Sequence, residues 1–313
     1  MWLKFLLAAG FALSLVVALV LKPGEPRADT GNRRDLAGKI DRGQNGRRLR
    51  LMTWNIGNGE LESETRAHAT DLPAVAQVIM DNDADAVALQ ELTGEDQLQL
   101  LLTHLKNQYR GYACSRGGGD RVDAVLVKGR SGSLLKPDRE EGLRMGALAE
   151  ARASAMSDRS ARFNDVPAGD HFAAAATFRL QKYRPEIVFV SAHADAFSAA
   201  RRRNFTADVV DWARSQTKGE LAFVAGDFNF EVSTRNKNNL FTDDGKHDSE
   251  SYAYLLKYFR DLGRDAGETS INDRRIDYIF GPSETISLSR AEVLRGAAVG
   301  RMDHWPLLVE VAF

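Results

Sequence analysis

Six short segments of the chain place polar side chains at the ends of apolar runs, and their residue types suit one kind of chemistry. The residues are Asn55, Glu91, His193, Asp227, Asn229, Asp277, Asp303 and His304. Carboxylate and amide oxygens suit a hard cation such as Mg²⁺, which keeps bound water and substrate phosphate. The histidines supply acid–base chemistry near neutral pH. The set therefore predicts metal-assisted hydrolysis of a phosphoester.

Each segment is a weak signal by itself, but the order of the six along the chain is specific. They read Thr-Trp-Asn-Ile (53–56), Gln-Glu-Leu (90–92), Ser-Ala-His (191–193), Gly-Asp-Phe-Asn (226–229), Arg-Ile-Asp-Tyr-Ile-Phe (275–280) and Met-Asp-His-Trp-Pro (302–306). In this order residues 49–313 resemble the endonuclease/exonuclease/phosphatase superfamily, which has the deoxyribonuclease I-like fold. The resemblance implies an α/β (α+β) fold, a four-layered α/β sandwich of two packed mixed sheets with helices on the outer faces. It also implies a metal-dependent phosphoric ester hydrolase.

The resemblance gives a role to each residue that would hold the metal or the phosphate. Glu91 would be the principal Mg²⁺ ligand, with Mn²⁺ able to substitute for Mg²⁺, and Asn55 would support the metal and the phosphate. Asp303 would help to hold the metal or its waters. Asp227 and Asn229 would position the attacking water and the scissile phosphate.

Two histidines would carry the acid–base chemistry. Asp277 would orient His304, as a triad carboxylate fixes the tautomer of an imidazole. His304 would then act as the general base or stabilise charge on the phosphoryl oxygens. His193 resembles the second histidine of the deoxyribonuclease and sphingomyelinase branches, where it would protonate the leaving oxygen or hold the phosphate. Its carboxylate partner is expected at Asp120, with Asp123 as the rival.

The motifs specify the reaction class rather than the substrate. A phosphodiesterase or nuclease acting on DNA or RNA is the leading interpretation, and a sphingomyelinase-like or other lipid or inositol-phosphate hydrolase is the alternative. Inositol-phosphate phosphatases typically carry a Trp-x-Asp-Arg-Ile motif, and the corresponding stretch here, 272–277, lacks the tryptophan. A catalytically inactive protein that binds at a membrane surface is a third hypothesis, which the complete set of candidate residues disfavours.

The apolar pattern predicts the elements that position these residues. Strands are expected at 49–56, 85–92, 122–127, 172–180, 186–193, 220–225, 275–280, 286–294 and 307–313, and helices at 71–80, 95–108 and 199–215. Many strands with few helices favour a sheet-on-sheet core with helices outside it. The polar stretches 137–170 and 231–250 are expected to be long loops.

Composition excludes several classes of protein. The chain has 313 residues, of which 43% are hydrophobic and 27% charged, as in an ordinary globular protein. Residues 49–313 carry a net charge of −6, so they lack the basic excess of a general nucleic-acid binder. Cys114 is the single cysteine, so no internal disulfide can form. We expect a monomer without a disulfide-linked partner.

The N-terminal residues predict attachment to a membrane. Residues 5–21 are uncharged and follow Lys4. As a helix they would rise about 25 Å, the short end of what spans a bilayer. Residues 1–21 are therefore expected to form a hydrophobic anchor, 22–48 a flexible basic tether and 49–313 the catalytic domain. The sequence after the apolar run is poor for cleavage, although a removed signal and secretion stay open. We expect the catalytic domain to lie outside the cytoplasm. The basic tether argues against this orientation, because the positive-inside rule favours basic segments on the cytoplasmic side.

Overall fold

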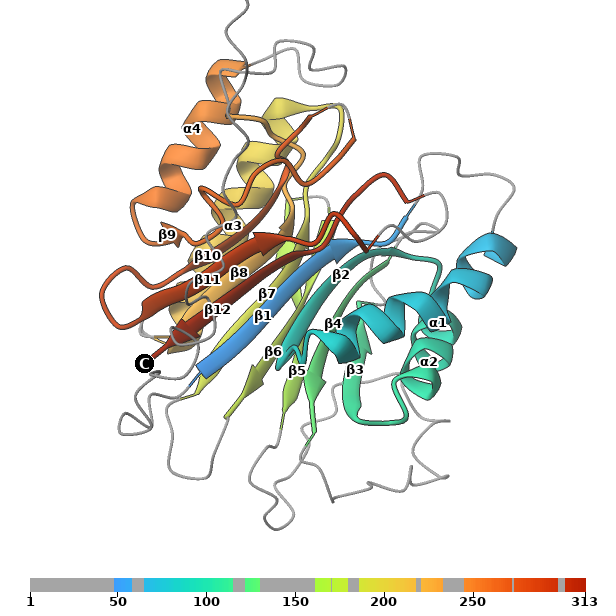
Figure 1. The fold of residues 1–313 in the computed structure, drawn as a ribbon. Coiled ribbons are helices and arrows are strands. Elements are labelled where there is room, and N and C mark those ends of the chain that lie inside the picture. Colours follow the sequence, from blue (N-terminus) through green and yellow to red (C-terminus); the bar gives the residue numbers. More distant parts are fainter. Residues whose placement is uncertain are drawn as a thin grey trace, which may run out of the picture. The chain divides into compact units, whose positions relative to one another are not determined.

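Two β-sheets packed face to face carry the residues of the candidate site. A computed structural model describes residues 48–57, 65–114, 122–129, 161–169, 171–179, 186–217, 221–232, 245–271, 273–297 and 302–313. Within these ranges each sheet has six strands (Figure 1). No helix of the described residues is long and apolar enough to cross a bilayer. The expected anchor and tether, residues 1–21 and 22–48, lie outside the described residues except for Arg48.

The first sheet is mixed. Its strand order is β11 (Ser287–Val293), β12 (Leu307–Ala312), β1 (Arg48–Asn55), β2 (Ala86–Leu92), β4 (Val122–Lys128) and β3 (Tyr109–Ala113). Strands β1 and β2 are parallel, and the other pairs are antiparallel. The parallel pair brings the carboxyl ends of β1 and β2, where Asn55 and Glu91 lie, to the same edge of the sheet.

The second sheet repeats this arrangement. Its order is β5 (Arg162–Ala168), β6 (His171–Phe178), β7 (Ile187–His193), β8 (Ala222–Asp227), β10 (Asp277–Gly281) and β9 (Arg260–Asp261). Here β7 and β8 are the parallel pair, with His193 directly beside Asp227. Strand β10 runs antiparallel to β8 and places Asp277 on the other side of Asp227. Three candidate residues therefore occupy adjacent positions on neighbouring strands.

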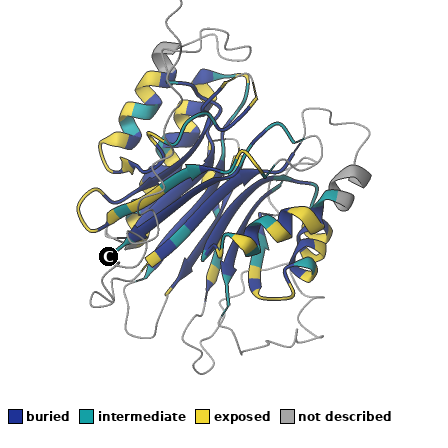
Figure 2. Ribbon diagram, viewed as in Figure 1, coloured by how far each residue is buried: buried dark blue, intermediate teal, exposed yellow. Residues whose placement is uncertain are grey.

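Helices cover the outer face of each sheet and complete four layers (Figures 1 and 2). Helices α1 (Thr65–Asp81) and α2 (Glu95–His104) pack their apolar side chains on the first sheet, and α3 (Ala199–Thr217) and α4 (Gly245–Leu256) pack theirs on the second. A third apolar cluster fills the space between the sheets. Burial of the apolar side chains in these three clusters supplies the main driving force for folding. The predicted four-layered sandwich is confirmed.

The structure differs from the expected elements in four places. The stretch 137–170, expected to be a loop, contains the edge strand β5, and 231–250 runs into helix α4. Strand β3 at 109–113 had no expected counterpart. The helix expected to reach residue 108 ends at His104, because Lys106 and Asn107 have φ angles of 56° and 54°, outside the helical range.

Candidate active site

The space between the sheets is apolar through most of its depth and becomes polar at one end. Along β7, for example, Ile187 and Phe189 belong to the cluster between the sheets, and Ser191 and His193 continue the same face by the two-residue period of a strand. The same change occurs on five more strands, which place Asn55, Gln90, Asp123, Asp227 and Asp277 after or before their inward apolar residues. One end of the sandwich is thereby lined with groups that bind cations and protons.

Glu91 reaches this end through an irregularity of β2. Leu89 pairs with Ala124 of β4, whereas Leu92 pairs with Val122, so β2 contains one extra residue. Glu91 itself has a φ of 62°, in the left-handed region that few non-glycine residues adopt. Such a β-bulge redirects a side chain. The Glu91 carboxylate accepts a hydrogen bond from Asn55 Nδ2 at 3.3 Å and lies 3.8 Å from His193 Nε2.

A glycine leaves the room that Glu91 occupies. A Cβ atom at Gly57 would lie 1.9 Å from Glu91 Oε2 and 2.7 Å from its Cβ. The backbone N–H of Gly57 also donates to Asn55 Oδ1 at 2.9 Å. Gly57 therefore holds the Asn55 amide while it admits the Glu91 carboxylate. Gly57 was not among the predicted site residues, although it lies two residues after Asn55.

Asp227 is the carboxylate on which the other groups converge. Its Oδ2 accepts from Asn55 Nδ2 at 3.1 Å and lies 3.7 Å from His193 Nε2 and 3.8 Å from His304 Nε2. Its Oδ1 accepts from the backbone N–H of Asn229 at 2.9 Å. Asn229 has a φ of 51° and donates its side-chain amide to the carbonyl of Ala194 at 3.0 Å. Asn229 thus links the ends of β7 and β8.

Gly226, just before Asp227, is required by a close approach of β7. Its φ is 146°, and a Cβ atom there would lie 1.8 Å from the carbonyl oxygen of Ala192. Only glycine fits both constraints. The conformation brings Asp227 level with His193 in the parallel register.

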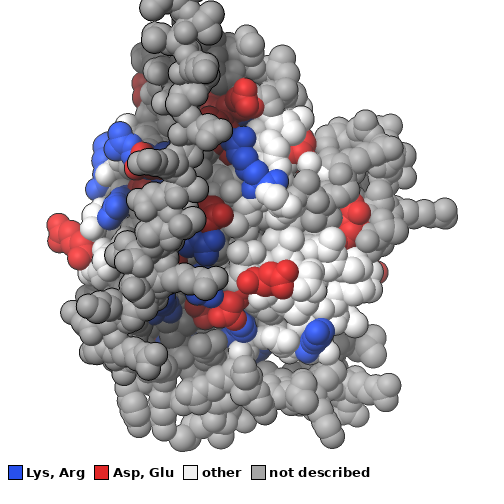
Figure 3. All heavy atoms as spheres, viewed as in Figure 1, with Lys and Arg blue, Asp and Glu red and all other residues white. Residues whose placement is uncertain are grey.

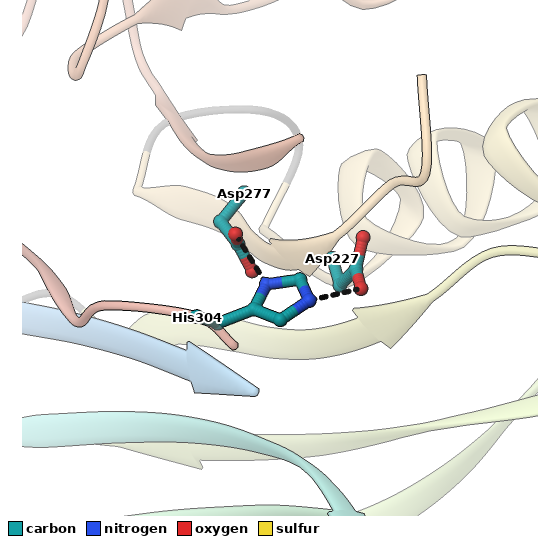
Figure 4. Close-up of side chains that lie close together, drawn as sticks. All are labelled: Asp227, Asp277 and His304. Carbon is teal, nitrogen blue, oxygen red and sulfur yellow. Dashed lines mark hydrogen bonds and ion pairs between the residues drawn. The ribbon is translucent and has the colours of Figure 1, made fainter. Parts of the chain in front are cut away.

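His304 and Asp277 form a buried pair (Figure 4). His304 Nδ1 lies 2.8 Å from Asp277 Oδ2, and both side chains are buried. Burial lowers the pKa of the imidazole, but the charge of Asp277, the hydrogen bond to it and the charges of Asp227 and Asp303 outweigh burial and raise that pKa to about 10. Burial raises the pKa of Asp277, and His304 opposes the rise. At neutral pH His304 is therefore an imidazolium whose Nε2–H faces the site.

The backbone on both sides of this pair is tied down. Trp54 donates its indole N–H to the carbonyl of His304 at 3.2 Å, and Thr269 Oγ1 accepts from the backbone N–H of Asp277 at 3.0 Å. Trp54 comes from the first sheet, and Asp277 from the second. The pair is thus fixed from both halves of the sandwich.

Among the described residues, Asp123, the rival candidate, is the carboxylate next to Nδ1 of His193. Its Oδ1 lies 3.9 Å from His193 Nδ1. Burial raises the pKa of Asp123 to about 7; His193 opposes the rise, and Asp227 and Glu91 add to it. Asp120, the expected partner, lies outside the described residues. His193 therefore stands between Asp123 on one side and Glu91 and Asp227 on the other.

Asp303 completes the set of acidic groups. Its Oδ1 lies 3.9 Å from His304 Nε2, and its side chain is partly exposed. Burial raises its pKa, and the charge of His304 opposes the rise. All eight residues of the six segments therefore meet at one end of the sandwich, which provides carboxylates for a cation, two imidazoles for proton transfer and amides that hold them.

The donor set fits a divalent cation. Glu91, Asp227 and Asp303 each place an oxygen within 4 Å of an imidazole nitrogen in the site. Ligand atoms of Asp227, Asp277 and His304 also lie within 4.8 Å of one another, although His304 Nδ1 is engaged by Asp277. Several carboxylates in partly buried surroundings repel one another unless positive charge balances them. Oxygen donors of this kind suit Mg²⁺ or Mn²⁺.

Solved structures similar to this one share its fold at low sequence identity. An endonuclease/exonuclease/phosphatase family protein from Bacteroides thetaiotaomicron is 18% identical, with a TM-score of 0.60 over 86% of this chain and 99% of its own. The human nocturnin catalytic domain with a bound sulfate is 17% identical, with a TM-score of 0.58 over 85% and 94%. A mannosyl-6-phosphatase from B. thetaiotaomicron is 19% identical, with a TM-score of 0.58 over 85% and 100%.

A family model gives the decisive match. No curated protein sequence compared with the chain matches it. The model described as the Endonuclease/Exonuclease/phosphatase family matches residues 52–300, which include all the candidate residues except Asp303 and His304. The chain belongs to the endonuclease/exonuclease/phosphatase family and is a phosphoric ester hydrolase.

Proposed function

We propose that the protein is a Mg²⁺-dependent phosphodiesterase. One observation carries the proposal: the Nε2 atoms of His193, at the end of β7, and of His304, in the segment before β12, lie 3.7 and 3.8 Å from the same oxygen of Asp227. Each imidazole has a second carboxylate behind its Nδ1. Hydrolysis of a diester needs a group that activates water and a group that protonates the leaving alcohol. The arrangement supplies both.

Glu91 would hold the metal, and Asp303 would bind the water molecules on the metal. Asn55 would fix the Glu91 carboxylate in place. When bound, Mg²⁺ would polarise the phosphoryl group and offset its negative charge. The Asn55 amide nitrogen donates to both Glu91 and Asp227, so one side chain sets the separation of the two carboxylates.

The chain's own residues divide the proton transfers. Asp227 takes a proton from the attacking water. Asn229 and Asn55 each donate a hydrogen bond to one oxygen of Asp227, and they thereby help to place this water. His193 gives a proton to the leaving oxygen as the ester P–O bond breaks. The His304 imidazolium, kept charged by Asp277, stabilises negative charge on the phosphoryl oxygens. Of the two roles expected for His304, its raised pKa favours charge stabilisation over general base catalysis.

The substrate is proposed to be a nucleic acid, with a phospholipid head group as the alternative. On the face shown in Figure 3, acidic and basic side chains of the described residues are interspersed. Recognition by a broad basic surface is therefore not supported there, and contacts close to the site would select the substrate. A panel of DNA, RNA, sphingomyelin and inositol phosphates, incubated with the full-length protein and Mg²⁺, distinguishes these classes.

Metal-dependent turnover is the first test. The full-length protein should hydrolyse bis-p-nitrophenyl phosphate with added Mg²⁺ or Mn²⁺ and lose the activity on addition of EDTA. Activity that is unchanged in EDTA contradicts the metal requirement. Absence of hydrolysis of every phosphoester would instead favour the inactive binding protein.

Attachment to a membrane through residues 1–21, with the catalytic domain outside the cytoplasm, is proposed from the uncharged run at 5–21 and its poor cleavage site. Fractionation of cells, followed by protease treatment of intact cells or spheroplasts, should find the protein in the membrane fraction and sensitive to protease. Recovery of all the protein in the cytosolic fraction refutes the anchor. A membrane-bound but protected domain refutes the orientation.

A further inference from the structure

A chain of buried hydrogen bonds crosses between the two sheets just beneath the candidate site. Thr53 of β1 donates to Gln90 Oε1 at 3.4 Å, Gln90 Nε2 donates to Ser191 Oγ of β7 at 2.9 Å, and Ser191 donates back to the carbonyl of Leu89 at 3.0 Å. Thr53, Gln90 and Ser191 are fully buried. We call Thr53, Gln90 and Ser191 the intersheet bridge.

The position of the bridge ties it to the site. Gln90 directly precedes Glu91, and Ser191 lies two residues before His193 on the same face of β7. Ser191 contacts the carbonyl of Leu89, which is the last residue of β2 that pairs with β4 before the bulge. This bulge redirects Glu91. One hydroxyl of the second sheet therefore holds the strand segment that turns Glu91 toward His193.

Packing does not require polar groups at this depth. One step deeper, the inward residues Ala88 of β2 and Phe189 of β7 are apolar and fully buried. Replacing a buried hydrogen-bonded pair by apolar groups of the same shape is often nearly neutral for stability. A hydrogen bond adds a fixed direction and distance, which apolar contact between two sheets does not.

We propose that Gln90 and Ser191 are positioning residues that fix the Glu91 carboxylate relative to His193 across the two sheets. The inference rests on the proposed function, because it assigns Glu91 to the metal. The bridge sets the spacing of β2 and β7 at the level below the 3.8 Å approach of Glu91 Oε1 to His193 Nε2. Loss of the bridge would let the bulge relax and would displace Glu91 from Asn55 and His193.

The test is calorimetric titration of the full-length protein with Mn²⁺ and with Mg²⁺, followed by measurement of turnover. Ser191→Ala removes both bonds of the hydroxyl. Loss of a hydrogen-bond partner of a metal ligand commonly weakens metal affinity by about 10- to 100-fold; because Ser191 acts on Glu91 only through Leu89 and Gln90, we expect the metal Kd to rise by about tenfold, the lower end of this range, together with a lower kcat. Phe189→Leu is the matched control, because it alters the buried core of the same strand and face without touching the bridge. It should lower the Tm and leave the metal Kd unchanged.

The outcomes separate the bridge from the proposed function. A Ser191→Ala protein with the wild-type metal Kd overturns the inference, and so does a Phe189→Leu protein whose metal Kd rises equally. Should Ser191→Ala not fold, Gln90→Met decides by the same criterion, since it removes one of the two hydrogen bonds between β2 and β7, the one from Gln90 to Ser191, and keeps the one from Ser191 to Leu89. A wild-type protein that neither binds metal nor shows metal-dependent hydrolysis overturns the proposed function itself, and the inference with it.

Discussion

Gly57→Ala should disable the metal site while leaving the fold intact. The added methyl carbon would lie 1.9 Å from Glu91 Oε2, 2.6 Å from its Cδ and 2.7 Å from its Cβ, and these are the three nearest atoms. Restoring an ordinary contact of about 3.4 Å requires the Glu91 carboxylate to move by about 1.5 Å. A misplacement of about 1 Å in an active site can cost about 100-fold in rate.

Stability should fall by less than activity. Two of the three close contacts are with the Glu91 carboxyl group, which can swing aside, but the third, at 2.7 Å, is with Glu91 Cβ, so the backbone of Gly57 or Glu91 must also shift. Overpacking of this kind costs about 1–3 kcal/mol. We therefore expect a folded protein with a lower Tm, a metal Kd at least about tenfold higher and a rate about 100-fold lower.

The assay compares the variant with Gly296→Ala, a glycine whose added Cβ would have no atom within 4 Å. Metal binding is followed by calorimetry, turnover on bis-p-nitrophenyl phosphate, and folding by circular dichroism. Wild-type metal affinity in Gly57→Ala would refute the reasoning, because Glu91 would then not act where the structure places it. Altered affinity in Gly296→Ala would show that the measurement does not report on the site.

Two further predictions concern the His304–Asp277 pair. At saturating Mg²⁺, His304→Ala should lower turnover by about 10³-fold or more, and Asp277→Asn should lower it by no more than that. Because the two residues act as a unit, the double variant should lose little more turnover than His304→Ala alone. If the losses of the two single variants multiply in the double variant, the residues act independently. The His304 pKa of about 10 exceeds the ordinary 6.5, so its stabilisation is complete below pH 6.5 and is lost as pH rises through 10. In metal-free buffer the wild-type free energy of unfolding should therefore fall, relative to the double variant His304→Ala/Asp277→Asn, by about 1.4 kcal/mol per pH unit between these values. Parallel pH profiles in urea denaturation would contradict the raised pKa.

The strands that carry the site were readily predicted because their apolar runs are strong. Strand β5 escaped prediction because its sequence, Arg-Phe-Asn-Asp-Val-Pro-Ala, is polar and contains Pro167, which an edge strand tolerates. Helix α4 escaped because its first residues are polar. Strand β5 lies at the edge of its sheet and α4 lies on the outer face of the second sheet, where the pattern of apolar residues in the sequence is weakest.

The site shows where local pattern stops being informative. The two-residue period of β4 places Asp123 on the inward face with Val125 and Val127, so periodicity could have favoured it as the partner described behind His193. The same period places Glu91 on the face opposite Gln90. Only the bulge brings Glu91 inward, and a bulge depends on pairing with β4 that the local sequence does not reveal.

Titration of activity with Mg²⁺ in wild-type protein and Glu91→Gln tests the central claim most directly. The substitution keeps the size of the side chain and removes the charge that would hold the cation. We predict that wild-type hydrolysis of bis-p-nitrophenyl phosphate rises from zero with Mg²⁺ and saturates, and that Glu91→Gln, folded by circular dichroism, shows little activity at limiting Mg²⁺. Equal activity of the two proteins at limiting Mg²⁺ would contradict the assignment of Glu91 and the metal-dependent mechanism built on it.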